Sequence, residues 1–438
     1  MRKNKGIDLY RKAKKIIPGG TQLLSKRPEM FLPDLWPSYY SRCKGAEVWD
    51  LDGKRYVDFT ISGVGTCTLG YADPDVNEAV MGAVKAGNMC TLNVPEEVEL
   101  AELMCRIHPW AKMVRYARSG GEAMAIAVRI ARAYKKKERV LFCGYHGWHD
   151  WYISANLEKD SALDGQLLPG LDPAGVPRSL LGTSKPFYYN DLENFKNLFK
   201  NNRKNMAAVV MEPVRGVWPK KDFLEEIRRI TRENDIPLIF DEITSGLRMT
   251  SGGIHLKLGV EPDIAVFSKA LGNGYPIAAV IGRSKVMNAA QSSFISSTYW
   301  TERIGPVAAI ATLKKHIKYN VSGHLTHIGE LTQEGWRKLA RKHSLDIEVS
   351  GIPPLSRWKI KMEDSQLLHT VIVSRMLEKA FLTSNVFYST YAHTEKHVND
   401  YLDALDGVLR ELIPIAENKG LRKIYKGKTA HSGFKRLA

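Results

Sequence analysis

Short apolar runs alternate with helix-like stretches between residues 61 and 310, and this alternation constrains the fold more than any other feature of the chain. The runs lie at 140–142, 207–211, 237–240 and 264–267. An apolar helical pattern at 123–133 precedes the first run, and an amphipathic one at 223–234 lies between the second and third runs. Buried strands that are joined by helices form a largely parallel sheet with helices on both faces. The sequence therefore predicts a large α/β domain in the middle of the chain.

The two ends of the chain have a different pattern. Two strand-like runs within 47–59 flank Asp52-Gly53, which is a strong hairpin signal, and a last helix is expected at 398–413. We therefore expect a smaller α+β domain that both chain ends build. The expected divisions are 1–60 for the first segment of the small domain, 61–310 for the large domain, 311–417 for the second segment of the small domain and 418–438 for a basic tail.

Charge and cysteine content limit the partners and the location. The net charge of +17 suits an anionic small substrate, a nucleic acid or an anionic membrane surface. No basic stripe carries the interleaved aromatic residues that stack on bases, and no apolar run is long enough to span a membrane. We expect neither nucleic acid nor membrane as a partner. Five scattered cysteines without a CxxC pair, and no signal peptide, predict a cytoplasmic location.

A small-residue turn, Ser119-Gly120-Gly121, precedes the helix at 123–133. The start of a helix exposes backbone N–H groups that bind anions, and the Ser119 hydroxyl adds a further donor. By itself the motif also fits an ordinary helix cap. At the carboxyl end of a strand in a doubly wound sheet, however, it predicts a phosphate site.

Two further side chains follow predicted strands. Asp241 ends the run at 237–240, and a buried carboxylate needs a partner such as a protonated pyridine nitrogen. Lys269 follows the run at 264–267, where apolar surroundings favour the neutral amine that forms a Schiff base. Each residue alone also fits a structural or surface role. A phosphate cup, an acid and a later lysine together are what pyridoxal 5'-phosphate (PLP) requires, so we expect PLP as the cofactor.

These residues belong to an ordered series of motifs. The series comprises Pro18-Gly19-Gly20, the stretch 49–58, Ser119–Ala123, Tyr145-His146-Gly147, Met211-Glu212-Pro213-Val214, Asp241-Glu242, Ser268-Lys269 and Ala392-His393-Thr394. Over about residues 10–410 the sequence resembles the class III (fold type I) PLP-dependent aminotransferases, especially the glutamate-1-semialdehyde 2,1-aminomutase branch. The resemblance implies a PLP-binding domain with a mostly parallel sheet and a smaller α+β domain.

The resemblance also implies roles for individual residues. The catalytic set is Lys269 as Schiff-base lysine and proton shuttle, Asp241 on the pyridine nitrogen and Tyr145 stacked on the ring. The remaining cofactor-binding positions that it implies are Ser119, Gly120, Gly121, His146, Glu212 and Thr298. Thr298 would reach the phosphate of a neighbouring subunit, which implies a homodimer with shared active sites. Lys26 and Arg27 lie near the position of a carboxylate-binding arginine of the aminomutases; either they have only a surface role, or one of them would bind a substrate carboxylate by a charge-assisted hydrogen bond.

Some positions depart from the family pattern or suggest another chemistry. Gly121 stands where the aminomutases have a threonine, and the segment after Thr298 also differs, which puts the aminomutase substrate in question. His146, His149 and Asp150 lie close together in sequence, but no further ligand cluster accompanies them. We therefore expect no metal.

The expected function is the transfer of an amino group between an amine or amino acid and a carbonyl acceptor through a Schiff base on Lys269. The alternative is glutamate-1-semialdehyde 2,1-aminomutase proper, an isomerase that would hold its intermediate under a lid, for which the weakly periodic stretch 154–185 is a candidate. A distant alternative is a non-catalytic basic binding protein on the same scaffold. The intact pair of Lys269 and Asp241 favours an enzyme.

Overall fold

The computed structural model describes residues 4–166, 169–214 and 216–432, and they form two units. The larger unit contains residues 74–323. The smaller unit combines residues 4–73 with residues 324–432, so both chain ends contribute to it. The divisions thus fall after Asp73 and Gly323, later than the sequence-based positions of 60 and 310.

A seven-stranded sheet forms the centre of the larger unit, with the order β4-β10-β9-β8-β7-β5-β6. Its strands are β4 (Met113–Ala117), β5 (Arg139–Cys143), β6 (Ser184–Pro186), β7 (Met206–Met211), β8 (Leu238–Asp241), β9 (Ile264–Phe267) and β10 (Ala278–Gly282). Strands β5 to β9 pair in parallel. Strand β10 pairs antiparallel with both β4 and β9, so β4 runs in the same direction as the parallel strands. The prediction of a mostly parallel sheet is confirmed.

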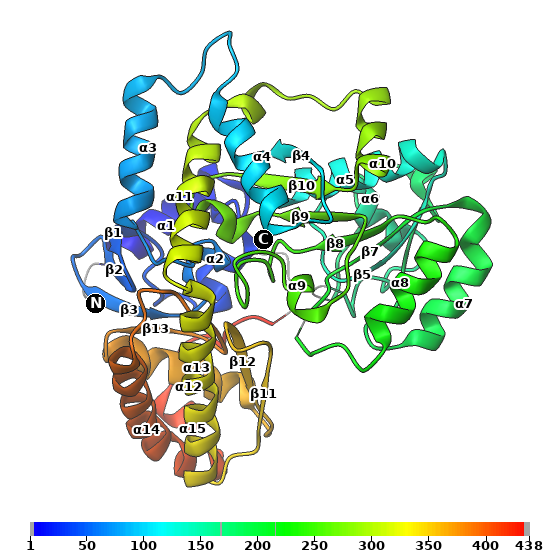
Figure 1. The fold of residues 1–438 in the computed structure, drawn as a ribbon. Helices are drawn as coiled ribbons and strands as arrows, with labels where there is room; N and C mark the ends of the chain where they lie inside the picture. Colours follow the sequence, from blue (N-terminus) through cyan, green and yellow to red (C-terminus); the bar gives the residue numbers. More distant parts are fainter. Residues whose placement is uncertain (1–3, 167–168, 215, 433–438) are drawn as a thin grey trace. The chain divides into compact units, whose positions relative to one another are not determined.

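Helices cover both faces of this sheet (Figure 1). One face packs against α5 (Gly120–Lys135), α6 (Asp150–Ile153) and α10 (Ser284–Met287). On the other face, α4 (Pro95–Ile107) and α11 (Ile304–Lys318) cover the part around β10, and α7 (Leu192–Asn202) and α8 (Phe223–Glu233) cover the part around β7. Successive strand residues point to opposite faces, and both faces are buried. The strands are therefore apolar throughout rather than alternating.

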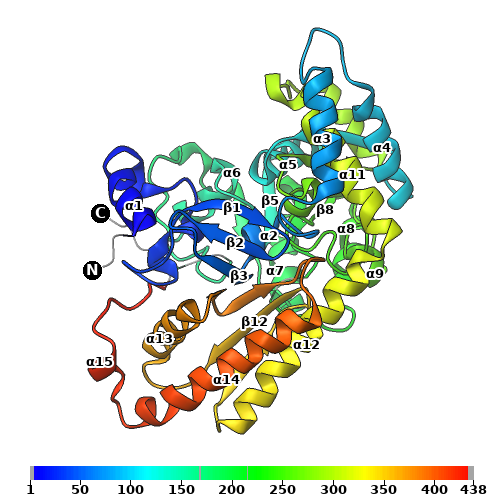
Figure 2. The same ribbon diagram turned by 90° about the vertical axis from the view of Figure 1, so that its left-hand side faces the viewer.

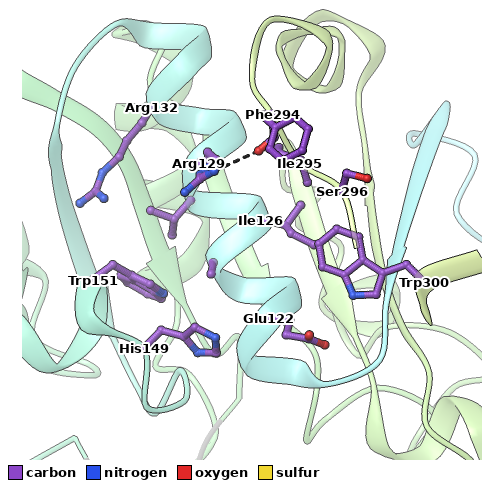
Figure 3. A pocket seen from close by; sticks show the side chains of 12 residues that line it. Glu122, Ile126, Arg129, Arg132, His149, Trp151, Phe294, Ile295, Ser296 and Trp300 are labelled. Carbon is purple, nitrogen blue, oxygen red and sulfur yellow. Dashed lines mark hydrogen bonds between the residues drawn. The ribbon is translucent and has the colours of Figure 1, made fainter. Parts of the chain in front are cut away.

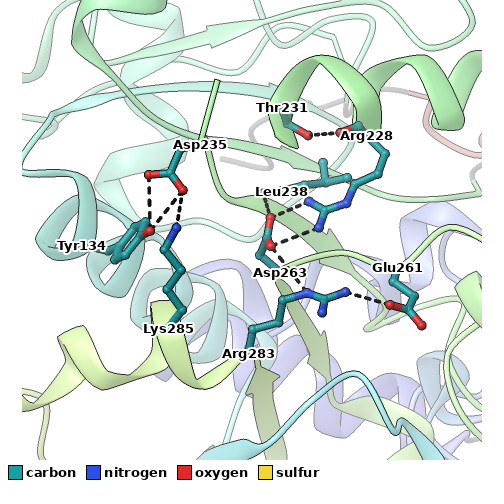
Figure 4. A network of polar contacts seen from close by, with 9 residues as sticks. All are labelled: Tyr134, Arg228, Thr231, Asp235, Leu238, Glu261, Asp263, Arg283 and Lys285. Carbon is teal, nitrogen blue, oxygen red and sulfur yellow. Dashed lines mark hydrogen bonds and ion pairs between the residues drawn. The ribbon is translucent and has the colours of Figure 1, made fainter. Parts of the chain in front are cut away.

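A polar network surrounds Asp263 at the start of β9 (Figure 4). Its carboxylate accepts two hydrogen bonds from the Arg228 guanidinium, at 2.6 and 3.1 Å, and a third from the backbone N–H of Leu238 at 3.0 Å. The Arg283 guanidinium lies 3.6 Å away. The network thus joins α8 and the segment after β10 to the amino ends of β8 and β9, opposite the edge where the predicted site residues lie.

The smaller unit contains two sheets and several helices. The first sheet, of order β1-β2-β3-β13, contains the predicted hairpin as β2 and β3, which pair antiparallel, while β13 pairs in parallel with β3. The second sheet, of order β11-β12-β14, is antiparallel. These strands are β1 (Tyr40–Lys44), β2 (Glu47–Asp50), β3 (Arg55–Phe59), β11 (Ile347–Ser350), β12 (Leu355–Ile360), β13 (Phe381–Thr383) and β14 (Val386–Tyr388). The chain ends therefore form a common α+β body.

Long helices pack against each other in this unit. Helix α12 (Val321–Lys342), most of which belongs to it, runs beside α14 (Glu395–Glu417) (Figure 2). The Trp336 indole N–H donates to the Tyr401 hydroxyl across this contact, at 3.3 Å. The unit also contains α1 (Lys5–Ile16), α2 (Ser62–Gly65), α13 (Ser365–Glu378) and α15 (Leu421–Ile424), and α3 (Pro74–Ala86) begins the larger unit. Across the described residues, no helix combines the length and apolarity needed to cross a membrane.

Polar contacts explain where the first division falls and how the C-terminal stretch is held. The Tyr71 hydroxyl donates to the Asp58 carboxylate at 2.5 Å, and the backbone N–H of Tyr391 donates to the Thr68 carbonyl at 2.7 Å, so residues 61–73 pack with the smaller unit. In the expected tail, Leu421 and Tyr425 are buried in the core of this unit. Residues 418–432 are therefore packed rather than loose, and 433–438 lie outside the described residues.

Candidate active site

The carboxyl ends of β4, β5, β7, β8 and β9 lie at one edge of the large sheet, because these strands run in the same direction. Each of them is followed or ended by residues that the sequence singled out. These are Ser119, Gly120 and Gly121 after β4, Tyr145 and His146 after β5, Glu212 after β7, Asp241 at the end of β8 and Lys269 after β9. The topology therefore brings the predicted residues to a common edge, the usual location of ligand sites in such sheets.

Lys269 lies in a strained turn and is partly buried. Its φ of 45° is in the left-handed region that non-glycine residues seldom adopt. Its Nζ donates to the Thr244 hydroxyl at 2.8 Å. Burial lowers the pKa of Lys269 and the Arg248 charge lowers it further, while the Asp241 and Glu212 carboxylates oppose this effect. A lower pKa increases the fraction of neutral amine, which is the nucleophilic form.

Asp241 is held from two sides. It is only 3% exposed, its Oδ2 lies 2.8 Å from the His146 Nδ1, and its Oδ1 accepts the backbone N–H of Ile243 at 3.0 Å. His146 is itself 1% exposed. These contacts fix the orientation of the carboxylate and leave it lone pairs for a further donor. His146 therefore contacts Asp241 directly, which the sequence-based placement near the ring did not specify.

The turn that carries Tyr145 is fixed through its backbone. The Glu212 carboxylate accepts the N–H of Tyr145 at 3.0 Å, and the Gln166 side chain accepts the N–H of Gly144 at 2.7 Å. The Tyr152 hydroxyl donates to the Gly144 carbonyl at 3.0 Å. Glu212 thus holds the turn, while Tyr145 as a residue remains 41% exposed. Burial, followed by the nearby carboxylates of Asp241 and Glu212, raises the pKa of Tyr145.

Helix α5 begins with a capping box. The Glu122 carboxylate accepts the N–H groups of Ser119 at 2.9 Å and Arg118 at 3.1 Å, and the Ser119 hydroxyl accepts the N–H of Glu122 at 3.5 Å. The first N–H groups of a helix have no acceptor within the helix. The capping box engages the N–H groups of Arg118, Ser119 and Glu122. The N–H groups of Gly120 and Gly121 are therefore the candidates for binding an anion at this helix terminus.

Gly120 and Gly121, the two glycines of the predicted phosphate cup (residues 119–121), are packed closely against neighbouring segments. A Cβ atom at Gly120 would lie 2.8 Å from Ile243, and a Cβ atom at Gly121 would lie 2.8 Å from the His149 ring. A Cβ atom at Gly147 would lie 3.1 Å from the Gly121 backbone. The cup therefore touches the segments that follow β5 and β8. The His149 ring thus occupies the space into which a side chain at position 121 would extend.

Thr298 lies in an exposed segment beside the cup. It begins a short 3-10 helix, Thr298–Thr301, and Arg118 donates to the Trp300 and Glu302 carbonyls, each at 3.0 Å. Arg118 also forms a 2.9 Å ion pair with Glu302. Because Arg118 directly precedes the cup, it connects this segment to the start of α5. The reach of Thr298 into a neighbouring subunit stays a prediction.

Lys26 and Arg27 belong to the smaller unit, where Lys26 ends a 3-10 helix, Leu24–Lys26. The Arg27 guanidinium lies against Gly19, whose positive φ of 73° turns the chain there. Their substrate role stays a prediction. No group of three histidine, cysteine or acidic side chains in the described part of the chain is arranged to hold a metal ion.

A hollow of about 440 Å³ lies over the outer face of α5, away from the sheet. Figure 3 shows the helix between His149 and Trp151 on one side and Phe294 and Trp300 on the other. Arg129 of α5 donates to the Phe294 carbonyl at 3.1 Å and so ties the helix to the segment that carries Phe294. The proposed lid stretch 154–185 begins beside this region, and its Gln166 is anchored on Gly144 as described above.

Sequence reasoning missed several residues that shape the site. Thr244, Gln166, Tyr152, Arg118 and Arg248 act through contacts that the fold creates. Only Arg118 and Thr244 carried a signal in the sequence, because they lie within two residues of the motifs at 119–121 and 241–242.

Comparisons with known proteins agree on one family. The family model described as Aminotransferase class-III matches residues 34–379. A 3-aminobutyryl-CoA aminotransferase from Cloacimonas acidaminovorans is 29% identical, over 93% of this chain and 97% of its own. A glutamate-1-semialdehyde 2,1-aminomutase from Methanococcoides burtonii is 30% identical, over 92% and 98%. A solved transaminase with PLP bound superposes with a TM-score of 0.83 at 25% identity, covering 96% of this chain and all of the other.

Proposed function

The chain belongs to the class-III aminotransferase family, whose enzymes use PLP, and we propose that its Lys269 holds this cofactor as a Schiff base. The fold is that of the fold type I aminotransferases, and the activity class is the movement of an amino group between an amine and a carbonyl compound. The observation that carries the residue assignment is the partly buried Lys269 amine, which shares its surroundings with the fixed Asp241 carboxylate.

The described residues fit the cofactor. The Asp241 carboxylate is buried and oriented, which suits a protonated pyridine nitrogen that makes the ring an electron sink. Gly120 and Gly121 present helix-terminal N–H groups to a phosphate, with Ser119 beside them. Tyr145 offers an exposed ring face on a turn that Glu212 holds. When bound, PLP stabilises the negative charge that develops at the substrate carbon.

The protein's own groups would then orient and move protons. The amine of Lys269, with its lowered pKa, is suited to accept and return a proton at the substrate carbon. Asp241 would keep the pyridine nitrogen protonated, and His146 would keep Asp241 in place. Lys26 or Arg27 would bind a substrate carboxylate. The intramolecular aminomutase reaction needs the same groups, so these residues alone do not separate it from transamination.

We further propose a cytoplasmic homodimer with shared active sites. Phe294 and Tyr299, which flank Thr298, are 87% and 70% exposed, and Trp148 beside the cup is 73% exposed. Exposed apolar clusters of this kind mark association surfaces. Phe294 also lines the hollow over α5 (Figure 3), and a second copy of the chain would cover it. Five free cysteines within the described chain suit a reducing compartment.

A covalent-labelling experiment tests the assignment of Lys269. Wild-type protein incubated with PLP is expected to gain a visible absorbance band, and borohydride reduction is expected to fix the cofactor to the peptide that contains residue 269. Lys269→Ala should show no fixed cofactor, because the amine is gone. Lys285→Ala is a matched control, since this lysine is exposed and pairs with Asp235. Cofactor attached at another lysine would contradict the proposal.

The same absorbance band reports the substrate. Candidate amines should include a β-amino acyl thioester and glutamate 1-semialdehyde, after the names of the two relatives. Loss of the band on addition of one amine identifies the donor. An aminotransferase then needs a second carbonyl compound to restore the band, whereas an aminomutase completes its cycle without one. Salt-sensitive nucleic-acid binding without any band would instead favour the binding-protein alternative.

A further inference from the structure

The hydroxyl of Thr244 is the group that holds the Lys269 amine in this structure, with Oγ1 and Nζ 2.8 Å apart. Thr244 lies three residues after Asp241, on the segment that leaves the end of β8. None of the motifs that point to the cofactor site includes it. The contact therefore joins the proposed Schiff-base lysine to a strand end that also carries Asp241, the proposed partner of the pyridine nitrogen.

Three contacts fix the backbone around Thr244. The N–H of Ile243 donates to the Asp241 carboxylate at 3.0 Å, and the N–H of Gly246 donates to the Glu242 carbonyl at 2.8 Å. The Arg248 Nε donates to the Thr244 carbonyl at 3.2 Å. The threonine side chain is also stiff at χ1 because it is β-branched. The hydroxyl is thus a rigid point against which a flexible lysine side chain can be held.

We propose that Thr244 is a positioning residue, which holds the Lys269 amine whenever this amine is not bonded to the cofactor. The inference rests on the proposed role of Lys269. A hydroxyl can accept from an ammonium and can also donate to the lone pair of a neutral amine. It therefore keeps its hydrogen bond through both protonation states of a lysine that carries protons. A carboxylate at this position would only accept, and it would hold the lysine in the ammonium form.

The other charged groups around the amine do not replace this function. Arg248 repels the ammonium, while the Asp241 and Glu212 carboxylates attract it. Within the described structure, Asp241 and Glu212 are engaged with His146 and with the Tyr145 N–H. The Thr244 hydroxyl is the group with a hydrogen bond to Nζ. Its removal should leave the amine in the same electrostatic surroundings but free to change rotamer.

Two effects are expected in Thr244→Val, which keeps the shape and loses the hydroxyl. A hydrogen bond to a charged group is stronger than one to a neutral group, so the loss should lower the pKa of Lys269. The reaction of the amine with PLP should also become slower, by about tenfold, at a pH high enough for the amine to be neutral in both proteins, because the nucleophile is no longer oriented. Comparison on this pH plateau separates orientation from protonation.

The test uses full-length protein from which PLP has been removed. Trace labelling with acetic anhydride across a pH series, read by mass spectrometry at residue 269, gives the pKa of the amine without any cofactor. Stopped-flow absorbance after addition of PLP gives the rate of capture. Thr244→Ser should retain both wild-type values within about twofold, since it keeps the hydroxyl. Ser245→Ala is a matched control, because this neighbouring hydroxyl donates to Glu242 and not to Lys269.

The outcomes separate the two proposals. A lower pKa and slower capture in Thr244→Val, with Thr244→Ser and Ser245→Ala close to wild type, support the positioning role. A capture rate in Thr244→Val equal to that of wild type on the plateau overturns it. If wild-type protein captures no PLP at all, the proposed function fails. In that case the acetic anhydride labelling alone tests the role of Thr244, and an unchanged Lys269 pKa in Thr244→Val overturns this role.

Discussion

Two neighbouring carboxylates at the end of β8 have the same kind of partner but different surroundings. The Asp241 carboxylate lies 2.8 Å from the His146 Nδ1, and the Glu242 carboxylate lies 2.8 Å from the His255 Nδ1. Successive strand residues point to opposite faces, so only the Asp241 pair belongs to the site edge with Lys269. The Glu242 pair extends instead to the Trp110 indole N–H, which donates to the His255 Nε2 at 3.0 Å.

This pair of contacts allows a controlled test of His146. In His146→Leu the Asp241 carboxylate loses a charge-assisted hydrogen bond, and we expect the affinity for PLP to fall by about tenfold or more. His255→Leu removes an equally buried histidine from the adjacent carboxylate, so it should reduce thermal stability without a comparable loss of affinity. Fluorescence titration with PLP and thermal melts measure the two effects. Equal PLP affinities in the two variants would exclude a specific role for His146.

At the scale of elements, the sequence predicted what depends on local pattern. The apolar runs at 140–142, 207–211, 237–240 and 264–267 became β5, β7, β8 and β9, because a strand buried on both faces needs a continuous apolar run. The antiparallel direction of β10 is set by a chain reversal after the turn at 272–274, and no apolar run encodes a direction. The apolar residues of β10 therefore could not have predicted its antiparallel direction.

The same limit applies to the site. Lys269, Asp241 and the cup at 119–121 were predictable because each begins at the end of a strand or within two residues of it, where local sequence places it. Thr244 contacts Lys269, which lies 25 positions away in the sequence. Gln166 contacts Gly144, which lies 22 positions away. Such contacts depend on how strands are ordered in the sheet, which the sequence pattern does not specify. The division of the chain after Asp73 also depends on a tertiary contact, between Tyr71 and Asp58.

The polar networks of Figure 4 give a prediction for the elements they join. In Asp263→Ala the Arg228 guanidinium, whose side chain is only 12% exposed, loses its bidentate partner, and the free energy of unfolding should fall by about 3 kcal/mol. Asp235→Ala is the control. Lys285, followed by Lys135, lowers the pKa of Asp235 to about 2. The Asp235 side chain, however, is 57% exposed, so solvent screens these ion pairs. We expect less than about 1 kcal/mol there. Urea unfolding curves measure both values, and similar losses would contradict the prediction.

At the scale of the whole molecule, the proposed dimer concerns the surface beside the cup. Thr298 lies in a segment that Arg118 ties to the start of α5, between the exposed rings of Phe294 and Tyr299. In a two-fold assembly one surface patch meets its own copy, so a residue beside the cup of one subunit can lie near the cup of the other. Each active site would then need residues from both chains, so activity would require the dimer. Mixed dimers of two variants can test this.

Lys269→Ala and Thr298→Ala should each reduce turnover of the amino donor that the spectral titration identifies. If Thr298 serves the partner's cofactor, a hybrid of the two variants has one doubly altered site and one intact site. Unfolding and refolding an equal mixture gives about half hybrids by statistics, so about a quarter of wild-type turnover should return. If Thr298 serves its own subunit, neither hybrid site is intact, and turnover stays at the average of the two variants. The substitution Phe294→Asp, placed in both variants, should abolish the recovery, because a charge on an 87% exposed ring position opposes burial in the interface.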